Sequence, residues 1–416
     1  MQGASGNVRD APAAPTVSPH RILFTDSTQG GVLGGSLTGV LELIPHLDRA
    51  RFEPVLVLFE PKPIIAELEA SGIRVHVLPA PRGPVAAYHG SRPGRALARA
   101  VNLWRIVGFR AREVVRVLRR ERPAIVYCSS GIVPSLPVVT AAALCRVPVI
   151  CHFKGFGRIG PEARFMSRWV DTAIFMTDEL ADHARAQGLH GRRFLTIFDG
   201  IDQTACVSGA GAAVRREFGI PADAPVVGIV GHIQGWKGQL LAVEAVARAR
   251  RHVPALRCLV VGGIHRLGAA YAERLRERIA APDLAGHVVL TGARRDVLAC
   301  MDAMDIVLHT SDHEPFGRVL IEAMAARRPV IAPREGGPRV IVADGVTGLL
   351  VPPRDPGALA AAIVELLAHP VRRRAMGHAG RARVEAVFGI REHVRAVEDV
   401  FDEILARRAG AAGVAA

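Results

Sequence analysis

The stretch DIVLHTSDHEPFGRVLIEAMAARRPVIAP, residues 305–333, decides the fold class of this chain. It begins with an apolar run of strand length, DIVLHTS, which ends close to Glu314 and a Pro-Phe-Gly corner. The helix-forming segment RVLIEAMAA follows and includes Glu322, and a second apolar run, RPVIAP, comes after it. A strand, a helix and a strand in this order are typical of a parallel β-α-β unit. The two glutamates then lie near the carboxyl end of the first strand, where open α/β sheets bind ligands.

The same alternation of apolar runs and helical stretches extends along most of the chain. The apolar runs of strand length are at 21–24, 54–59, 75–79, 124–129, 147–152, 171–177, 225–231, 256–263, 287–292, 305–311, 328–333 and 348–352. Halfway along, the pattern breaks into the small-residue segment DGIDQTACVSGAGAAV. We therefore predict an α/β protein of two tandem Rossmann-like, doubly wound domains that face each other across a cleft, each with about six strands.

The break in the pattern sets the predicted domain boundaries. We expect a disordered lead-in at 1–20, an N-terminal domain at 21–203 and a C-terminal domain at 204–385. A helix and tail at 386–416 are expected to pack back toward the N-terminal domain. The lead-in lacks the continuous apolar core of a signal peptide, and no apolar run reaches the roughly 18 residues of a membrane-spanning helix.

The composition excludes several classes of protein. Half of the 416 residues are hydrophobic, which is enough for two packed cores. The formal charge of +14 comes almost entirely from arginine, because the only lysines are Lys62, Lys154 and Lys237. The six cysteines include no Cys-x-x-Cys pair, so neither a zinc cluster nor a disulfide framework is expected. This cysteine usage fits a cytoplasmic protein.

One basic segment stands apart from the rest of the chain. Residues 82–122 hold eleven arginines against Glu113 and Glu121, with Trp104 and Phe109 between them. The segment is either a solvated helix that packs on the sheet or a basic amphipathic surface that docks on anionic lipid at the inner face of a membrane. It contains no recognised nucleic-acid-binding module, so nucleic acid is not an expected partner.

Residues suited to phosphate binding follow two other predicted strands. Gly34 and Gly35 precede a helix, where a phosphate or a sugar can come close to the backbone, although a plain tight turn explains them equally well. His232 and Lys237 follow the strand at 225–231. A lysine in so arginine-rich a chain indicates a compact ammonium beside a diphosphate, and the alternative is a solvated loop lysine. Neither loop matches a dinucleotide or a Walker fingerprint.

The corner after Glu314 is the most informative part of the sequence. If Pro315 and Gly317 turn the chain, the free N–H groups of residues 316–319 face the cleft at a helix N-terminus and form a cradle for anions. Carboxylates beside such a cradle would repel phosphates, so Glu314 and Glu322 are expected to hold neutral hydroxyls. One acid on a hexose and one on a ribose would fit a nucleotide-sugar.

With these motifs the chain resembles a retaining glycosyltransferase of the GT-B fold, specifically glycosyltransferase family 4 (glycosyl transferases group 1). The motifs that carry the resemblance are LGGS (33–36), RPAIVYCSSG (122–131), DTAIFMTDEL (171–180), FDGID (198–202), GHIQGWKG (231–238), LVVGG (259–263), LTGARRDV (290–297), the glutamate pair, and RPVIAPREGG with DGVTGLLVPPRD. The resemblance places the acceptor in the N-terminal domain and the nucleotide-sugar in the C-terminal domain.

The resemblance also implies roles for residues of the C-terminal domain. Glu314 would contact the hydroxyls of the transferred sugar, Glu322 would bind the donor ribose, and Lys237 would neutralise the departing diphosphate. His232 would assist Lys237, and Arg294 would lie in the loop that contacts the nucleotide. The residues whose backbone would hold the sugar and diphosphate are Phe316, Gly317, Arg318 and Val319.

On the N-terminal side, Gly34 and Gly35 would close on the phosphates. His152, at the end of a strand, matches the histidine that the family places near the sugar; without the resemblance, a structural role is the commoner reading of such a histidine. Lys154 and Arg158 would help to position the acceptor. No Asp-x-Asp motif occurs, so no metal and no other cofactor is expected.

The implied reaction is retaining transfer of a sugar from a nucleoside-diphosphate-sugar to the hydroxyl of a glycan or lipid-linked acceptor, in bacterial cell-envelope glycan, polysaccharide or glycolipid synthesis. Two alternatives stay open: a nucleotide-sugar epimerase of GT-B fold, and a non-catalytic nucleotide-binding subunit. The sequence departs from the family pattern at three positions. His232 stands where arginine is usual, Arg327 where a small residue is usual, and Val340 where glutamate is common.

Overall fold

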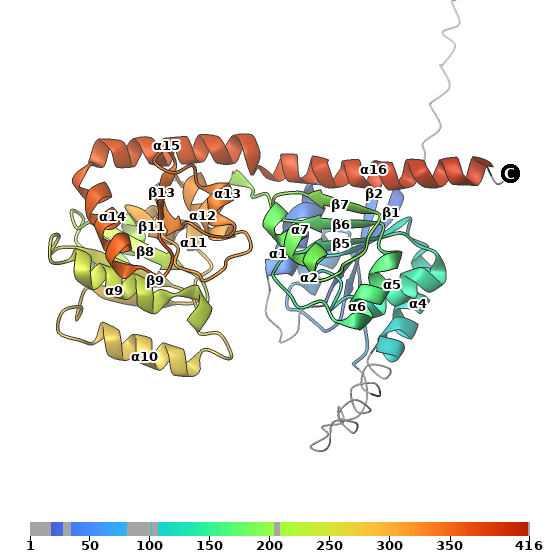
Figure 1. Cartoon of the computed structure of the whole chain (residues 1–416), viewed down its shortest axis with the longest axis horizontal. Coiled ribbons are helices and arrows are strands. Elements are labelled where there is room, and N and C mark those ends of the chain that lie inside the picture. Colours follow the sequence, from blue (N-terminus) through green and yellow to red (C-terminus); the bar gives the residue numbers. More distant parts are fainter. Residues whose placement is uncertain (1–17, 28–34, 81–100, 102–106, 204–208, 415–416) are drawn as a thin grey trace, which may run out of the picture.

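Two α/β domains lie side by side in the computed structural model, which describes residues 18–27, 35–80, 101, 107–203 and 209–414 (Figure 1). The strands of the N-terminal domain are β1 (His20–Asp26), β2 (Phe52–Leu58), β3 (Arg74–Val77), β4 (Ile125–Cys128), β5 (Val149–Phe153), β6 (Thr172–Phe175) and β7 (Arg193–Thr196). Its helices are α1 (Gly35–Leu43), α2 (Ile65–Ala70), α4 (Phe109–Glu121), α5 (Leu136–Cys145), α6 (Pro161–Met166) and α7 (Asp178–Ala186), with 3₁₀ turns η1 (Ile44–His46) and η3 (Ser167–Trp169).

The C-terminal domain repeats this plan. Its strands are β8 (Val226–Val230), β9 (Arg257–Val261), β10 (Val288–Gly292), β11 (Ile306–Leu308), β12 (Val330–Pro333) and β13 (Gly348–Val351). Its helical elements are α8 (Gly211–Glu217), η5 (Gly235–Lys237), α9 (Gln239–Ala249), α10 (Ala269–Ile279), α11 (Val297–Asp302), α12 (Arg318–Ala325), α13 (Pro338–Ile341), α14 (Pro356–Ala368), α15 (Pro370–Val387) and the start of α16 (Ile390–Val414).

Both sheets are parallel and doubly wound. The strand orders are β3-β2-β1-β4-β5-β6-β7 and β10-β9-β8-β11-β12-β13, so the direction of winding reverses beside β1 and β8. All twelve predicted strands are present, and the predicted two-domain Rossmann-like fold is confirmed. The first sheet has one further strand, β7, which the sequence did not reveal. Its residues RFLT are only half-buried at the sheet edge and form no apolar run.

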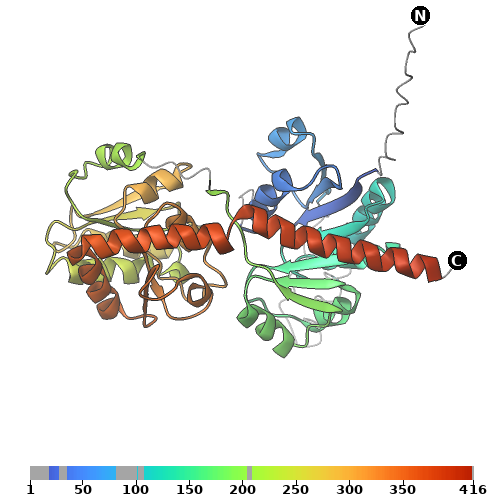
Figure 2. The same ribbon diagram turned by 90° about the horizontal axis from the view of Figure 1, so that it is seen from above.

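The C-terminal helices connect the two domains. Helix α15 lies over the C-terminal domain and α16 runs along the N-terminal domain (Figures 1 and 2). The ring of Phe401 in α16 lies 5.3 Å from that of Phe52, and both rings are buried in the core of the N-terminal domain. This long helix therefore holds the last segment of the chain on the first domain.

The chain crosses between the domains twice, and the two crossings are hydrogen-bonded to each other. The N–H of Ile201 donates to the carbonyl of Phe388, and the N–H of Ile390 donates to the carbonyl of Ile201, both at 3.0 Å. A Cβ atom at Gly200 would lie 2.7 Å from the carbonyl oxygen of Gly389, so only glycine allows this close approach. The crossings form one joint at the base of the cleft.

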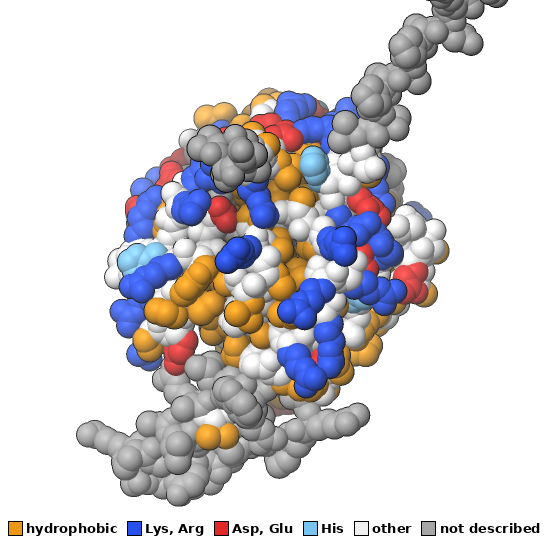
Figure 3. Space-filling model, turned by 90° about the vertical axis from the view of Figure 1, so that its right-hand side faces the viewer, with side chains coloured by type: hydrophobic (Ala, Val, Ile, Leu, Met, Phe, Trp, Pro, Cys, Tyr) orange, Lys and Arg blue, Asp and Glu red, His pale blue; other side chains and the backbone are white. Residues whose placement is uncertain are grey.

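Some of the predictions fall on residues outside the described ranges. These are the lead-in up to residue 17, Gly34, and most of the basic segment, at 81–100 and 102–106. Within the part that the structure describes, no helix has the length and apolarity needed to cross a membrane. The outer end of the N-terminal domain presents Lys and Arg side chains between hydrophobic ones (Figure 3).

Candidate active site

A cavity of about 580 Å³ lies between the two domains. The N-terminal domain contributes residues that follow its parallel strands, among them Ser130 after β4 and Lys154 after β5. The C-terminal domain contributes Lys237, Glu314 and the amino end of α12. The cavity is therefore at the carboxyl ends of the strands, where both sheets of a doubly wound protein bind ligands.

Lys237 and Glu314 form an ion pair in this cavity. Lys237 Nζ donates to Glu314 Oε2 at 2.7 Å, and His309 Nε2 lies 3.5 Å from the same oxygen. Burial favours the neutral form of Glu314, but the positive charge of Lys237 outweighs it, so the pKa of Glu314 falls below its usual value. Burial lowers the pKa of His309 to about 4. The lowered pKa values mean that near neutral pH Glu314 is ionised and the His309 imidazole is neutral.

The corner at 315–317 places the end of α12 in the cavity. Gly317 is the N-cap residue, with φ of 105°, and no side chain caps the helix. Most residues avoid this left-handed region, so glycine is needed for the turn. Phe316 anchors the corner from behind, because its buried ring stacks on that of Phe198 at 6.2 Å. Gly317, Arg318 and Val319 line the cavity at the positive end of the helix dipole.

Glu322 occupies the second turn of the same helix and is in a different electrostatic environment. Its Oε1 lies 3.8 Å from Nη2 of Arg318. Burial raises the pKa of Glu322 above its usual value, although Arg318 opposes the shift and Glu42 adds to it. The two glutamates of the motif therefore differ: Glu314 is held ionised, and Glu322 is the easier one to protonate. Glu322 lies behind the cavity lining rather than in it.

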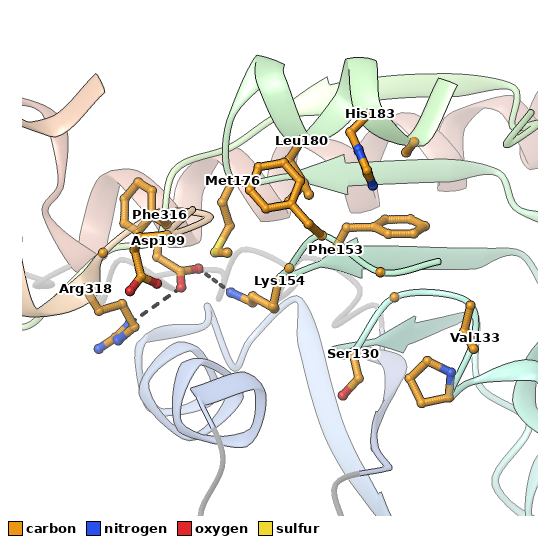
Figure 4. A pocket seen from close by; sticks show the side chains of 18 of the residues that line it. Ser130, Val133, Phe153, Lys154, Met176, Leu180, His183, Asp199, Phe316 and Arg318 are labelled. Atoms are coloured by element: carbon orange, nitrogen blue, oxygen red, sulfur yellow. Dashed lines mark hydrogen bonds and ion pairs between the residues drawn. The ribbon is translucent and has the colours of Figure 1, made fainter. Parts of the chain in front are cut away.

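A network of buried and partly buried charges joins the domains beside this pair (Figure 4). Arg318 Nη2 lies 2.7 Å from both carboxylate oxygens of Glu42 in α1, and Arg318 Nη1 lies 3.8 Å from Asp199 Oδ2. Lys154 forms an ion pair with the other oxygen of Asp199. Burial would raise the pKa of Asp199, but Lys154 and Arg318 together hold it well below the usual range.

The sequence prediction missed this network. It assigned only the backbone of Arg318 to the site, and it assigned no role to Asp199 or Glu42. Asp199 lies in the motif FDGID, but its need for charged partners follows from its 2% exposure, which only the structure shows. Glu42 gave no signal, because a glutamate on a helix is ordinarily solvated.

His152 lies behind the cavity rather than on its lining. The ring is fully buried, with Nδ1 2.5 Å from the Tyr127 hydroxyl, and it stacks on His393 of α16 at 6.1 Å. Its Nε2 has no hydrogen-bond partner among the described residues. Burial and the charge of Lys154 hold its pKa well below the usual value. Arg158 is exposed on the loop after β5, and its side chain is not part of the lining.

Two further residues with predicted donor roles, His232 and Arg294, lie outside the cavity lining. Gly35, also predicted to bind the donor, begins α1. The exposed His232 ring lies 6.3 Å from His265, and burial, together with the charges of His265 and Lys237, lowers its pKa. Arg294 is bound in an exposed cluster, with Nη2 2.9 Å from Glu217 and 2.7 Å from Asp296, which raises its pKa. The donor roles of these residues stay predictions.

Comparisons with known proteins match both domains. The N-terminal domain matches the glycosyl transferase 4-like domain over residues 34–198, and the C-terminal domain matches glycosyl transferases group 1 over residues 212–383. A D-inositol 3-phosphate glycosyltransferase of Kineococcus radiotolerans is 34% identical over 241 residues, which is 54% of this chain and 55% of that protein. A D-inositol 3-phosphate glycosyltransferase of Segniliparus rotundus is 39% identical over 191 residues, which is 44% of this chain and 41% of that protein. The chain spans about half the length of the curated relatives that it matches.

Solved structures resemble the chain over nearly its full length. The Anabaena protein HepE, in complex with UDP and glucose, gives a TM-score of 0.77 at 23% identity and covers 92% of this chain and 99% of its own. Sucrose-phosphate synthase from Thermosynechococcus elongatus gives a TM-score of 0.75 at 22% identity, and the match covers 93% of this chain and 100% of that protein. This likeness, with the two sheets and the cavity between them, defines the GT-B fold. Since the two family matches span both domains, the chain belongs to glycosyltransferase family 4, the glycosyl transferases group 1.

Proposed function

We propose that the protein transfers a sugar from a nucleoside-diphosphate-sugar to an acceptor hydroxyl, with retention at the anomeric carbon. The observation that carries this proposal is the Lys237–Glu314 ion pair beside the amino end of α12, inside the interdomain cavity. Without ligand, the two side chains neutralise each other. When a diphosphate binds at the helix end, Lys237 can pair with it, and Glu314 becomes free to accept hydrogen bonds from sugar hydroxyls.

The same groups account for the chemical step. The bond between the anomeric carbon and the phosphate oxygen breaks, and a bond from that carbon to the acceptor oxygen forms on the same face. The Lys237 ammonium and the N–H groups at the start of α12 stabilise the negative charge that develops on the diphosphate. The acceptor proton passes to the leaving phosphate oxygen, so no further side chain is needed as a base. Closure of the cleft would exclude water and protect the donor from hydrolysis.

A uridine nucleotide is the first donor to test. The resembling HepE structures hold UDP, UDP with glucose, and UDP-glucose. We therefore propose UDP-glucose as the probe for turnover, and a role in the synthesis of cell-envelope glycans, polysaccharides or glycolipids. The positive charge that a diphosphate requires comes from Lys237 and α12, so we propose that transfer needs no metal ion.

The kinetic test uses two variants at the ion pair. Glu314→Gln and Lys237→Met should each lower kcat at least about a hundredfold, the usual effect of removing one group that stabilises the transition state. Transfer at near wild-type rates in both variants would refute the proposal. The alternatives give other results: an epimerase converts the donor without any acceptor, and a non-catalytic subunit binds UDP without turnover.

We also propose that the N-terminal domain binds peripherally to an anionic membrane surface. Helix α4 carries five arginines and two glutamates, and Leu144, Phe165 and Trp169 are exposed on the same domain. Basic side chains around exposed aromatic ones suit a lipid headgroup region. Binding to phosphatidylglycerol vesicles at low salt should weaken in Trp169→Ser but not in Leu267→Ser, which changes an exposed residue of the C-terminal domain. If the wild-type protein ignored these vesicles, this part of the proposal would fall.

A further inference from the structure

One wall of the interdomain cavity is apolar. It belongs to the N-terminal domain and follows the carboxyl ends of three neighbouring strands, β4, β5 and β6. The side chains that form it include Ile132, Val133, Phe153, Phe156, Met176 and Leu180. Phe153, Met176 and Leu180 are buried in the protein, whereas Val133 is 43% exposed at the rim. The wall is thus a preformed surface, anchored in the core, that continues into the reaction site.

The charged groups of the cavity are at its other end. Figure 4 shows Arg318 and Asp199 on one side of Lys154, and Phe153 and Val133 on the other. Lys154 is the only lysine or arginine that the described residues of the N-terminal domain contribute to the lining, and Asp199 already pairs with it. The cavity therefore changes from charged at the Lys237–Glu314 pair to apolar within a single space.

We infer that this wall binds the body of the acceptor, and that the acceptor is an amphiphile: a hydroxyl carried by a hydrophobic group of alkyl, isoprenoid or aromatic character. The inference rests on the proposed glycosyl transfer. The hydroxyl has to reach the sugar between Lys154 and Glu314, and the hydrophobic group then lies against the apolar side chains. Ligand sites of this kind are mostly apolar, with a few polar groups that fix orientation.

The same geometry disfavours a phosphorylated polyol on this wall. Among the residues that the structure describes, Lys154 is the only lysine or arginine of the N-terminal domain at this wall, and a phosphate there would compete with Asp199 for it. Polar hydroxyls against Ile132 and Phe153 would lose hydrogen bonds to water without replacing them. We therefore expect the acceptor to differ from the D-inositol 3-phosphate for which relatives are named.

The test is a chain-length series of acceptors. Methyl, butyl, hexyl and octyl β-D-glucosides, kept below their micelle concentrations, are measured for binding to the UDP-loaded protein by saturation-transfer NMR and for transfer from UDP-glucose. Affinity and kcat/KM should rise about two- to fourfold per added methylene until the wall is covered, as expected for apolar burial. D-inositol 3-phosphate, as the polar comparator, should bind more weakly than the octyl glucoside.

A matched pair of variants tests whether the dependence of kcat/KM on alkyl chain length arises at the apolar wall. Val133→Asp introduces a charge at the rim of the wall, and Val346→Asp makes the same change at a 58% exposed position of the C-terminal domain outside the cavity. In Val133→Asp the ratio of octyl to methyl kcat/KM should fall toward one, and in Val346→Asp it should stay high. Equal ratios in the two variants, no chain-length dependence in the wild type, or tighter binding of the inositol phosphate would overturn the inference.

UDP binding, measured by calorimetry in the same samples, distinguishes a failure of the acceptor inference from a failure of the proposed glycosyl transfer. If UDP binds and chain length has no effect, the apolar acceptor is refuted and the glycosyltransferase proposal stands. If neither UDP nor another nucleoside diphosphate binds, the proposed function fails, and the inference about the acceptor fails with it.

Discussion

Arg318 of the C-terminal domain places one guanidinium nitrogen 2.7 Å from both carboxylate oxygens of Glu42 in the N-terminal domain. Asp199 and Glu322 each lie 3.8 Å from the same guanidinium, so Arg318 contacts three acids at the cleft, and Lys154 pairs with one of them, Asp199. Because Glu42 and Asp199 belong to the N-terminal domain, Arg318 forms an electrostatic contact between the two domains at the cleft. The reaction site and the contact between the domains are therefore electrostatically linked.

Replacing Arg318 should destabilise the protein strongly. Arg318→Met leaves the carboxylates of Glu42, Asp199 and Glu322 close together with one partner fewer, and removing one member of a buried ion pair typically costs about 3–5 kcal/mol. We expect the free energy of unfolding in urea to fall by about 3 kcal/mol. Arg276→Met is the matched control, because its pair with Glu273 is exposed on both sides and should change stability by less than about 1 kcal/mol. Similar losses in the two variants would contradict the proposed role of Arg318.

The shape of the cation at position 237 should matter as much as its charge. Lys237 Nζ lies 4.0 Å from the centre of the Trp236 ring and 2.7 Å from Glu314, which leaves space for an ammonium between them. A planar guanidinium is larger and donates in a fixed fork. Lys237→Arg should therefore lower kcat/KM by about tenfold or more, which is about 1.4 kcal/mol of transition-state stabilisation.

The control for this substitution is Lys62→Arg. Lys62 is buried and pairs with Glu60 at 2.7 Å, away from the cavity. The same change there should leave kcat/KM for UDP-glucose within about twofold, in line with the small effects of changes far from a site. A Lys237→Arg enzyme with wild-type kinetics would show that position 237 requires only a positive charge.

The fold was more predictable than the site because periodicity is local and ion pairing across a cleft is not. Every strand that carried an apolar run was found, and β7 was missed because its edge position leaves RFLT half-buried. Lys237 and Glu314 were expected to share a site because both follow strands at one edge of a sheet, and they lie 2.7 Å apart. Arg318 and Glu42 are 276 residues apart, and their pairing depends on how two domains meet, which no local pattern encodes.

His232 offers a test of donor binding. The family usually has arginine at this position, and the lowered pKa of His232 leaves its ring neutral near pH 7. His232→Arg adds a permanent cation on the loop after β8, so the KM for UDP-glucose should fall about three- to tenfold at pH 7.5. In the wild type the KM should also be lower at a pH below the lowered pKa of the His232 ring, where the ring carries a proton, than at pH 7.5. A variant with unchanged KM at both pH values would place His232 outside the donor site.

Removal of metal ions should not stop the reaction. Lys237 and the amino end of α12 already supply the positive charge that a departing diphosphate requires. Transfer from UDP-glucose in excess EDTA should therefore keep its rate within about twofold of the untreated enzyme. The control is a second sample, passed through a chelating resin and then given Mn²⁺. Complete loss in EDTA with recovery on adding Mn²⁺ would show that the diphosphate depends on a metal.

Acid should destabilise the protein in a pH window set by its buried histidines. His393 packs against Asp199, Lys154, Arg318 and His152, and its Nδ1–H donates to the Phe198 carbonyl at 2.7 Å. Burial is the main reason that its pKa is lowered from 6.5 to about 4. Below about pH 6.5 the unfolded chain binds a proton at this residue and the folded chain does not, so stability falls as the pH falls. The loss continues until the pH reaches the folded pKa, and it amounts to about 2 kcal/mol at pH 5.

His393→Gln should remove this contribution while keeping a side chain that can donate to the Phe198 carbonyl. Between pH 7 and pH 5, the free energy of unfolding of the variant should fall about 2 kcal/mol less than that of the wild type. His309, whose pKa is also about 4, would still make the free energy of unfolding fall with pH in both proteins. His252→Gln, at an exposed position, is the matched control and should reproduce the wild-type profile. If the profiles of the wild type and His393→Gln coincide, His393 already takes up a proton in the folded protein within this pH range, and the charge of Asp199 and the hydrogen bond to the Phe198 carbonyl govern its pKa rather than burial.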